Sequence, residues 1–270
     1  MSSTPSTGGV NSLGALPLPN ESQMGGVKVQ QKSQKYPERE LKIRIEDDFC
    51  YNNNVLNAPT QIRLGFIRKV YAILTAQLCA TVFVCSIFML NESAKTFIQS
   101  NQWLVFVLAF ATLGVLIGMQ VNRNKYPTNF ILLATFTLME SVMLGSLVTF
   151  YDSGLVLEAF AITLSLTVML MCYASQTKHN YTSCGAALLV SLWLLILAPL
   201  FQLYFQSDSF ELMVSVGGAG VFCLFIIVDT QLIMAKVSPE EYIVASIELY
   251  LDIINLFIYI LRILKATRRD

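Results

Sequence analysis

Charged residues are scarce in this chain. Asp, Glu, Lys and Arg make up 13% of its 270 residues, and the formal net charge is +0. A balanced charge gives no electrostatic reason to expect a nucleic-acid partner. The chain also lacks a Walker phosphate loop, an HExxH zinc-protease motif and a GxSxG nucleophile motif. We therefore expect that the protein is not an enzyme and needs no cofactor.

Residues that commonly bind metals are also few. The chain has one histidine, His179, and six cysteines, and the cysteines show neither paired spacing nor metal-ligand spacing. Most cysteines lie within or beside apolar segments, as small hydrophobic residues do: Cys50, Cys79, Cys85, Cys172, Cys184 and Cys223. His179 follows Lys178 between two apolar segments, and we expect it to be a solvated loop residue rather than a pH switch.

Long apolar runs dominate the rest of the sequence. Hydrophobic residues make up 54% of the chain, and the mean hydropathy is +0.58, far above that of a soluble domain. A bilayer-spanning helix needs about 20 apolar residues. Seven segments meet this requirement: 70–90, 103–121, 126–151, 159–177, 184–205, 212–235 and 242–263. The sequence therefore predicts an all-α membrane protein, a bundle of seven transmembrane helices.

The chain divides into a polar tail and a membrane domain. Residues 1–62 are rich in Ser, Gly, Pro and Asn, continue with mixed charges and have no apolar period, so we expect a disordered tail. Residues 63–270 form the seven-helix domain.

The basic residues between the predicted spans set the orientation. One side carries Arg63, Arg68, Lys69, Arg123, Lys125, Lys178 and Lys236, whereas the other carries Lys95. By the positive-inside rule the first side, with the N-terminus, is cytosolic. Three basic residues after 263 disagree with this bias: Lys265, Arg268 and Arg269. Either the segment 242–263 crosses against the bias or it is re-entrant, and we favour a full crossing.

Acidic residues inside the predicted spans are the candidate functional groups. Buried carboxylates in membranes are costly and usually face a partner or a water-filled cavity. Asp229 lies seven residues before Lys236, about 10 Å from the cytosolic surface, and Asp252 lies ten residues after Tyr242, about 15 Å deep. A short connection makes these two helices antiparallel neighbours, so the carboxylates can meet. Arg123 ends its helix on the same side and can reach inward.

The chemistry of such a group predicts a sensor. Two carboxylates in a low-dielectric environment share a proton and titrate as a pair, and an arginine can satisfy one negative charge. The alternative is that Asp229 and Asp252 only join helices as polar contacts. Two further acids, Glu140 and Glu248, are candidate polar residues of the interior or pore, whereas Glu158 is expected to be solvated or to cap its helix.

Several ordered segments resemble a known family. They are "IRLGFIRKVYAILTAQL", "NRNKYPTNFILLATFTLME", "LEAFAITLSL", "FIIVDTQLIM" and "ELYLDIINLFIYILRIL". Together they look like the transmembrane BAX inhibitor motif family, and within it the Lifeguard branch. The polar tail lies outside this resemblance.

The resemblance implies both an architecture and an activity. It implies a seven-helix bundle with the C-terminal helix at its centre, resident in endoplasmic reticulum or Golgi membranes. It also implies a pH-sensitive calcium leak that lowers store calcium and protects against apoptosis. In that family two aspartates share a proton and an arginine latches them, and the matching residues here are Asp229, Asp252 and Arg123.

The expected partners are the lipid bilayer, calcium, protons, and membrane proteins of the death pathway or calcium channels. Tight calcium sites need six to eight oxygen ligands. Asp229 and Asp252 cannot supply that number, so they suit a gate or a weak, transient calcium site. Calcium is therefore expected as the permeant ion.

Two other functions fit parts of the pattern. Two aspartates on neighbouring helices also occur in intramembrane aspartyl proteases. Those enzymes carry Tyr-Asp and Gly-x-Gly-Asp motifs, whereas this chain has "IIVDTQ" and "LYLDII", so a protease is improbable. A non-conducting scaffold that regulates calcium channels or death-pathway proteins stays open.

Cysteine-accessibility labelling checks the topology. Because the basic residues favour one side, we expect cysteines introduced near Arg123 and Lys178 to react from the cytosol and one near Lys95 to react from the opposite side. The same labelling at Lys265 distinguishes a full crossing from a re-entrant helix. The reverse pattern would rule out this orientation.

Overall fold

The structure is a computed structural model, and it describes residues 60–268 apart from 124, 206, 236 and 238–240. The chain separates into two compact units, Met1–Arg44 and Ile45–Asp270. Every described residue belongs to the second unit. Residues 1–59 of the predicted disordered tail lie outside the described residues, as do Cys50, Lys236 and Arg269, and the predictions for them stay predictions. Residues 60–62, which were assigned to the tail, are helical instead, because the helix of the first span extends beyond its apolar run.

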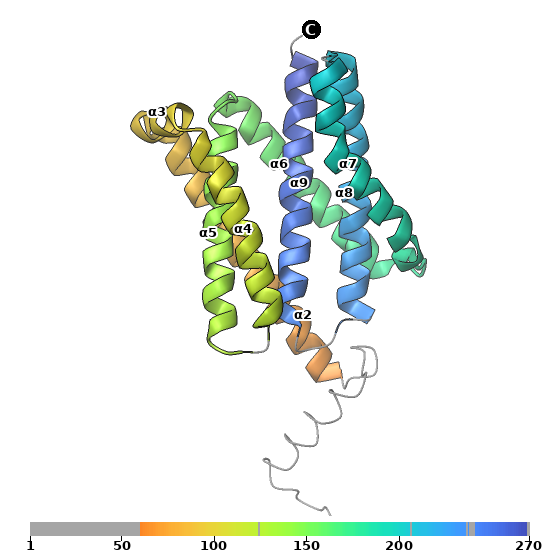
Figure 1. The fold of residues 1–270 in the computed structure, drawn as a ribbon. Coiled ribbons are helices and arrows are strands. Elements are labelled where there is room, and N and C mark those ends of the chain that lie inside the picture. The colour runs from red at the N-terminus through yellow and green to blue at the C-terminus, as the bar shows by residue number, and fades with distance from the viewer. Residues whose placement is uncertain (1–59, 124, 206, 236, 238–240, 269–270) are drawn as a thin grey trace, which may run out of the picture. The chain divides into compact units, whose positions relative to one another are not determined.

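The described residues form only helices (Figure 1). In chain order these are α2 (Thr60–Leu90), α3 (Glu92–Ser100), α4 (Trp103–Val121), α5 (Thr128–Val148), α6 (Ser153–Gln176), the 3₁₀ turn η3 (Tyr181–Cys184), α7 (Gly185–Phe205), α8 (Asp208–Ala235) and α9 (Tyr242–Arg268). Seven of them are long and apolar enough to cross a membrane. This confirms the predicted all-α, seven-span fold class.

The first span begins earlier than predicted. The helix α2 starts at Thr60 rather than at residue 70, so the basic residues before the apolar run are helical. Phe66 and Val70, one helical turn apart, are both buried. The extra turns of α2 therefore pack against the bundle on one face while Arg68 and Lys69 are exposed on the other.

The helix α3 was not predicted. The Asn91 side chain caps it by accepting hydrogen bonds from the backbone N–H groups of Ser93 and Ala94, at 3.0 and 3.2 Å. Gln99 donates to the backbone oxygen of Thr149 at 3.1 Å, which fastens α3 to the end of α5. The segment between the first two spans is therefore a short amphipathic helix, and its cap at Asn91 was the sequence signal.

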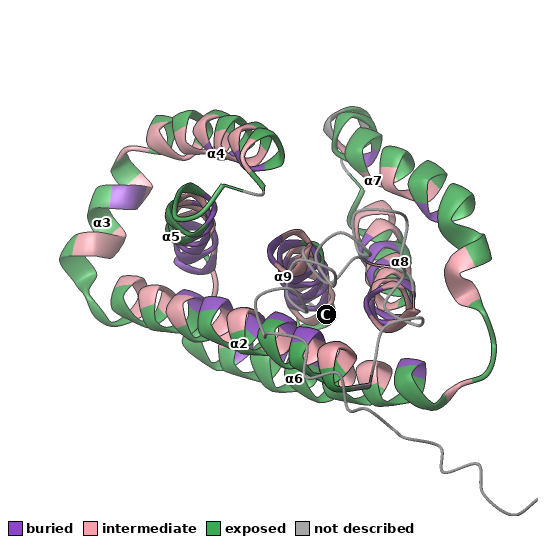
Figure 2. Ribbon diagram, turned by 90° about the horizontal axis from the view of Figure 1, so that it is seen from below, coloured by how far each residue is buried: buried purple, intermediate pink, exposed green. Residues whose placement is uncertain are grey.

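The helix α9 is the most buried of the spans. It packs against α8, α2 and α6, and Figure 2 shows it lying among these helices. Its buried face includes Leu249, Tyr250, Leu256 and Leu261, none of which has any exposed surface. A helix buried on most of its surface has little contact with lipid, so it can carry polar residues that a lipid-facing helix cannot.

Two ion pairs mark the ends of α9. Glu241, just before the helix, pairs with Arg123 after α4, and Arg268 at the last residue of α9 pairs with Glu158 in α6. We call these the Arg123 end and the Arg268 end of the bundle. The chain therefore runs the full length of the bundle in α9, as the full-crossing alternative requires. Glu158 is exposed, which confirms the solvated alternative, and it forms an ion pair instead of capping its helix.

Hydroxyl groups join α9 to α2 and α5. The Tyr250 hydroxyl lies 2.9 Å from the Thr81 hydroxyl, which lies 3.0 Å from that of Ser141. All three side chains are buried, and the Tyr250 ring packs edge-on against Phe136 with 6.2 Å between centroids. Thr81 and Ser141 also donate to backbone oxygens of their own helices, so the network joins the three helices through side chains that are already held in place.

Removing the Tyr250 hydroxyl should destabilise the bundle. Tyr250→Phe keeps the ring contact with Phe136 but leaves the Thr81 hydroxyl with one partner fewer, and we expect a loss of about 1 kcal/mol. Thermal unfolding in detergent measures the change. The control is Tyr126→Phe, because Tyr126 is 81% exposed. Equal melting temperatures for the two variants would contradict the role of the network.

Candidate functional site

The structure brings the two predicted aspartates together. Asp229 is six residues before the end of α8, and Asp252 is ten residues after the start of α9, so both lie well inside their helices, at about 9 and 15 Å from those helix ends. Their carboxyl groups lie within electrostatic range of each other, on two helices that pack together. An ionised carboxylate only accepts hydrogen bonds, so the two groups can bond directly only when one of them carries a proton.

The surroundings of the pair are unequal. Asp252 is 7% exposed, and its Oδ2 has no hydrogen-bond partner within the part of the chain that the structure describes. Asp229 is half-buried. Glu248, one turn before Asp252 on α9, is exposed and lies within electrostatic range of both aspartates. Three acidic groups therefore converge on the seam between α8 and α9.

Arg123 pairs with a residue that the sequence did not single out. Its Nη1 donates to Glu241 Oε1 at 2.8 Å, with the two side chains 50% and 36% exposed. The guanidinium thus lies at the end of α9 from which the chain leads to Asp252, but its ion pair is with Glu241. The predicted latch between Arg123 and the aspartate pair stays a prediction. Glu241 was missed because it lies outside the apolar run, in a stretch with other acids.

Glu140 lies on the opposite side of α9. It is half-buried on α5, next to Ser141, and its electrostatic neighbour is the Tyr250 hydroxyl. Among the described contacts it belongs with the hydroxyl network rather than with the aspartates. The structure therefore separates the two predicted interior acids, since Glu248 lies beside the aspartate pair.

A glutamine near Asp229 fastens a loop to α8. The Gln231 amide donates to the His179 backbone oxygen at 2.8 Å and accepts from the Tyr181 backbone N–H at 2.9 Å. His179 is exposed in this loop, which confirms the prediction of a solvated loop residue. This contact was not predictable from the sequence, because one glutamine in an apolar helix does not indicate its partner.

A resident metal site is not formed by the described residues. No group of three or more His, Cys, Asp or Glu side chains among them could hold a metal ion. An ion that meets Asp229 and Asp252 would therefore find few protein ligands, as a permeant ion does.

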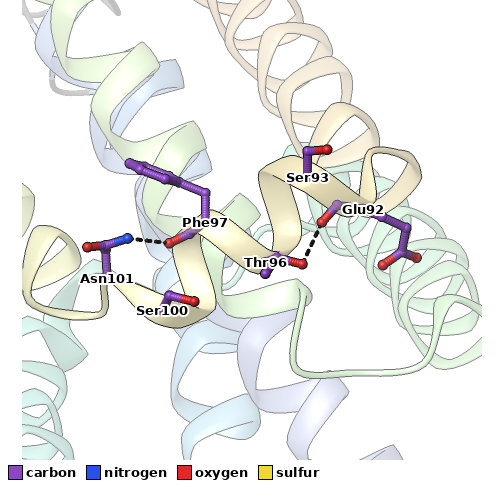
Figure 3. Close-up of a pocket in the computed structure, with 6 residues that line it drawn as sticks. All are labelled: Glu92, Ser93, Thr96, Phe97, Ser100 and Asn101. Carbon is purple, nitrogen blue, oxygen red and sulfur yellow. Dashed lines mark hydrogen bonds between the residues drawn. The ribbon is translucent and has the colours of Figure 1, made fainter.

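The polar surface of α3 is separate from the acidic seam. A cavity of about 480 Å³ lies against Glu92, Ser93, Thr96, Phe97, Ser100 and Asn101 (Figure 3). Its hydrogen bonds stay within α3 and its cap, from Thr96 to the Glu92 oxygen and from Asn101 to the Phe97 oxygen. The cavity thus contains no partner for the aspartates on α8 and α9.

The fold and the site define a class: a multi-span helical membrane protein with a carboxyl pair between its last two helices. The sequence matches the family "Inhibitor of apoptosis-promoting Bax1" over residues 63–269. The chain therefore belongs to the BAX inhibitor family, as the resemblance indicated.

Individual relatives agree along most of the chain. The Golgi anti-apoptotic protein of vaccinia virus (strain Lister) is 42% identical over 225 residues, which cover 83% of this chain and 95% of the viral protein. Protein lifeguard 4 of Mus musculus is 42% identical over 225 residues, with 83% and 94% covered. Bax inhibitor 1 of Schizosaccharomyces pombe is 41% identical over 236 residues, with 87% and 89% covered.

The Arg123–Glu241 contact can be tested by a double-mutant cycle. With Arg123→Gln and Glu241→Gln, singly and together, we expect a coupling of up to about 1 kcal/mol in unfolding free energy, because the pair is partly exposed. Chemical denaturation in detergent measures it, and the coupling should shrink in 1 M salt, where the screening length is about 3 Å. The control cycle pairs Arg123→Gln with Glu92→Gln, which should be additive because Glu92 lies in α3. Zero coupling with Glu241, but coupling of Arg123→Gln with Asp229→Asn, would support the latch instead.

Proposed function

We propose that this protein is a pH-sensitive calcium leak channel of an intracellular membrane, the Golgi or the endoplasmic reticulum, and that it protects the cell from apoptosis by lowering store calcium. The carboxyl pair of Asp229 and Asp252, within electrostatic range of each other between α8 and α9, carries the proposal. The names of two relatives, a Golgi anti-apoptotic protein and a Bax inhibitor, support the location and the protective role.

The carboxyl pair supports a gate because its contact depends on protonation. While one proton is shared, Asp229 and Asp252 attract each other and hold α8 against α9. When the proton leaves, two negative charges face each other in a medium of low dielectric constant, and Glu248 adds a third nearby. The repulsion separates the seam, so a rise in cytosolic pH opens the path in this mechanism.

Glu248 supports a water-filled approach to the pair. It lies in the second turn of α9, inside a span, and its side chain is exposed at the surface of the bundle. A charged side chain in a span faces water or a partner rather than lipid. Glu248 lies one helical turn from Asp252, so water that hydrates Glu248 would give protons and ions a route to Asp229 and Asp252.

The calcium chemistry is that of a transit site. A calcium ion in the opened seam would meet the oxygens of Asp229, Asp252 and Glu248 and keep part of its water shell. Such weak coordination lets the ion leave, which a channel needs. The Arg123 end, where the basic residues of the predicted topology gather, is the cytosolic end in this proposal.

The decisive variant is Asp252→Asn. The amide keeps the shape and the hydrogen bonding of the side chain but cannot ionise. We expect the variant to fold and to show a calcium leak that no longer changes between about pH 6 and 8, the range into which coupling brings such groups. Asp229→Asn should alter the same response, and the double variant should be strongly non-additive because both changes remove one coupled pair.

Calcium efflux from liposomes that contain the purified protein measures the response. The matched control is Asp152→Asn, because Asp152 is an exposed carboxylate before α6 whose side chain makes no capping hydrogen bond. A wild-type pH response in Asp252→Asn would reduce the pair to a packing contact. No flux from any variant would favour the scaffold, and cleavage of a peptide would favour the protease.

A further inference from the structure

The seam between α8 and α9 is built from two facing rows. On α9, Glu248, Asp252, Asn255, Tyr259 and Arg262 are spaced by four, three, four and three residues, which places them on one face. On α8, Gly218, Phe222, Phe225 and Asp229 show the same spacing of four, three and four. The two helices are antiparallel neighbours in the bundle. The acidic half of the seam lies toward the Arg123 end, and the aromatic half lies toward the Arg268 end.

The aromatic half is tightly closed. The rings of Tyr259 and Phe222 stack with 5.8 Å between centroids and 25° between planes, and Phe222 is 5% exposed. Phe225 continues the contact on α8, at 5.8 Å from Phe222. Aromatic stacks of this geometry add to the free energy of apolar burial.

Gly218 makes room for this stack. A Cβ atom at residue 218 would lie 2.6 Å from the Tyr259 ring, closer than side chains approach. Only glycine at this position lets Tyr259 lie flat across the face of α8. The Tyr259 ring therefore lies between α8 and α9 at this point, where it packs on Gly218 and Phe222.

Cations lie just beyond the stack. The Arg262 guanidinium lies 5.7 Å from the Tyr259 ring centroid and is within electrostatic range of the Tyr151 hydroxyl in the turn between α5 and α6. Lys265 lies 4.8 Å from the Tyr151 ring centroid. A calcium ion entering from the Arg268 end would meet positive charge first and then the apolar stack.

We propose that Tyr259, stacked on Phe222 and seated on Gly218, is a second gate of the α8–α9 path, at its Arg268 end. This gate acts in series with the aspartate pair and does not titrate with it, since its contacts are apolar and cation–π. The proposal rests on the proposed function for its role in calcium flux. The closure of the path at Tyr259 can be measured without calcium.

If Tyr259 closes the path, a water-soluble reagent should reach position 255 from only one side of the membrane. This residue lies between Asp252 and Tyr259 in the polar row and is half-buried. We introduce Asn255→Cys into a chain whose six native cysteines are replaced, and label it with a membrane-impermeant thiol reagent in oriented vesicles. Cysteines at Lys178 and Lys95 report the orientation. With Tyr259 in place, we expect labelling from the Arg123 end alone.

Removing the ring should open the other side. With Tyr259→Ala, we expect labelling of Asn255→Cys from the Arg268 end to rise by about two- to tenfold, which is the population change expected for losing one aromatic pair. Tyr259→Phe is the matched control and should leave the labelling unchanged, because the stack survives. Phe222→Leu breaks the same stack from α8 and provides a second variant if Tyr259→Ala does not fold.

Calcium efflux separates this proposal from the proposed function. If the channel conducts, Tyr259→Ala should raise the leak at alkaline pH and leave its pH midpoint unchanged, because the aspartate pair is intact. If no variant conducts but labelling follows the expected pattern, the gate stands and the calcium function fails. Two results would overturn the gate. One is labelling of Asn255→Cys from the Arg268 end while Tyr259 is in place. The other is no increase of that labelling in either Tyr259→Ala or Phe222→Leu.

Discussion

The contact between Asp229 and Asp252 is the constraint on which the arrangement of the last two helices depends. Two carboxyl groups inside a membrane are tolerated only if they share a proton, face water or meet a positive charge. Here they face each other across the α8–α9 seam, and Asp252 is almost fully buried. This position requires α9 to be surrounded by protein, which explains why the helix with the most ionisable residues is also the most buried span.

The central helix is held by two kinds of polar contact on its two sides. Toward α2 and α5 it is bound by hydroxyl groups, through Tyr250, Thr81 and Ser141, and these do not change charge near neutral pH. Toward α8 it is bound by carboxyl groups, which do. The hydrogen bonds on the α2 and α5 side are made by hydroxyl groups, with Glu140 as a carboxyl neighbour, whereas three acidic groups meet on the α8 side. A titrating gate would therefore act mainly on α8.

Features that depend on long sequence patterns could be predicted from the sequence. Features that depend on a single contact between two side chains could not. Seven apolar runs predicted seven spans, and the short connection between the last two predicted that Asp229 and Asp252 could meet. The ion pair of Arg123 with Glu241 was not predictable, because hydropathy fixes the depth of a residue but not the partner of a flexible guanidinium. The helix α3 was missed because its polar face lowers the hydropathy of residues 92–100, although the cap at Asn91 was present in the sequence.

The charges at the Arg268 end show how a helix can cross against the positive-inside bias. If the Arg123 end is cytosolic, as proposed, α9 carries its basic last turns to the far side of the membrane. Each of these residues has a local partner there: Arg268 pairs with Glu158, Lys265 lies over the Tyr151 ring, and Arg262 contacts Tyr151 and Tyr259. Cations at a helix C-terminus are also favoured by the helix dipole. The basic residues are therefore stabilised by contacts with α6 and with the turn between α5 and α6 in the folded bundle.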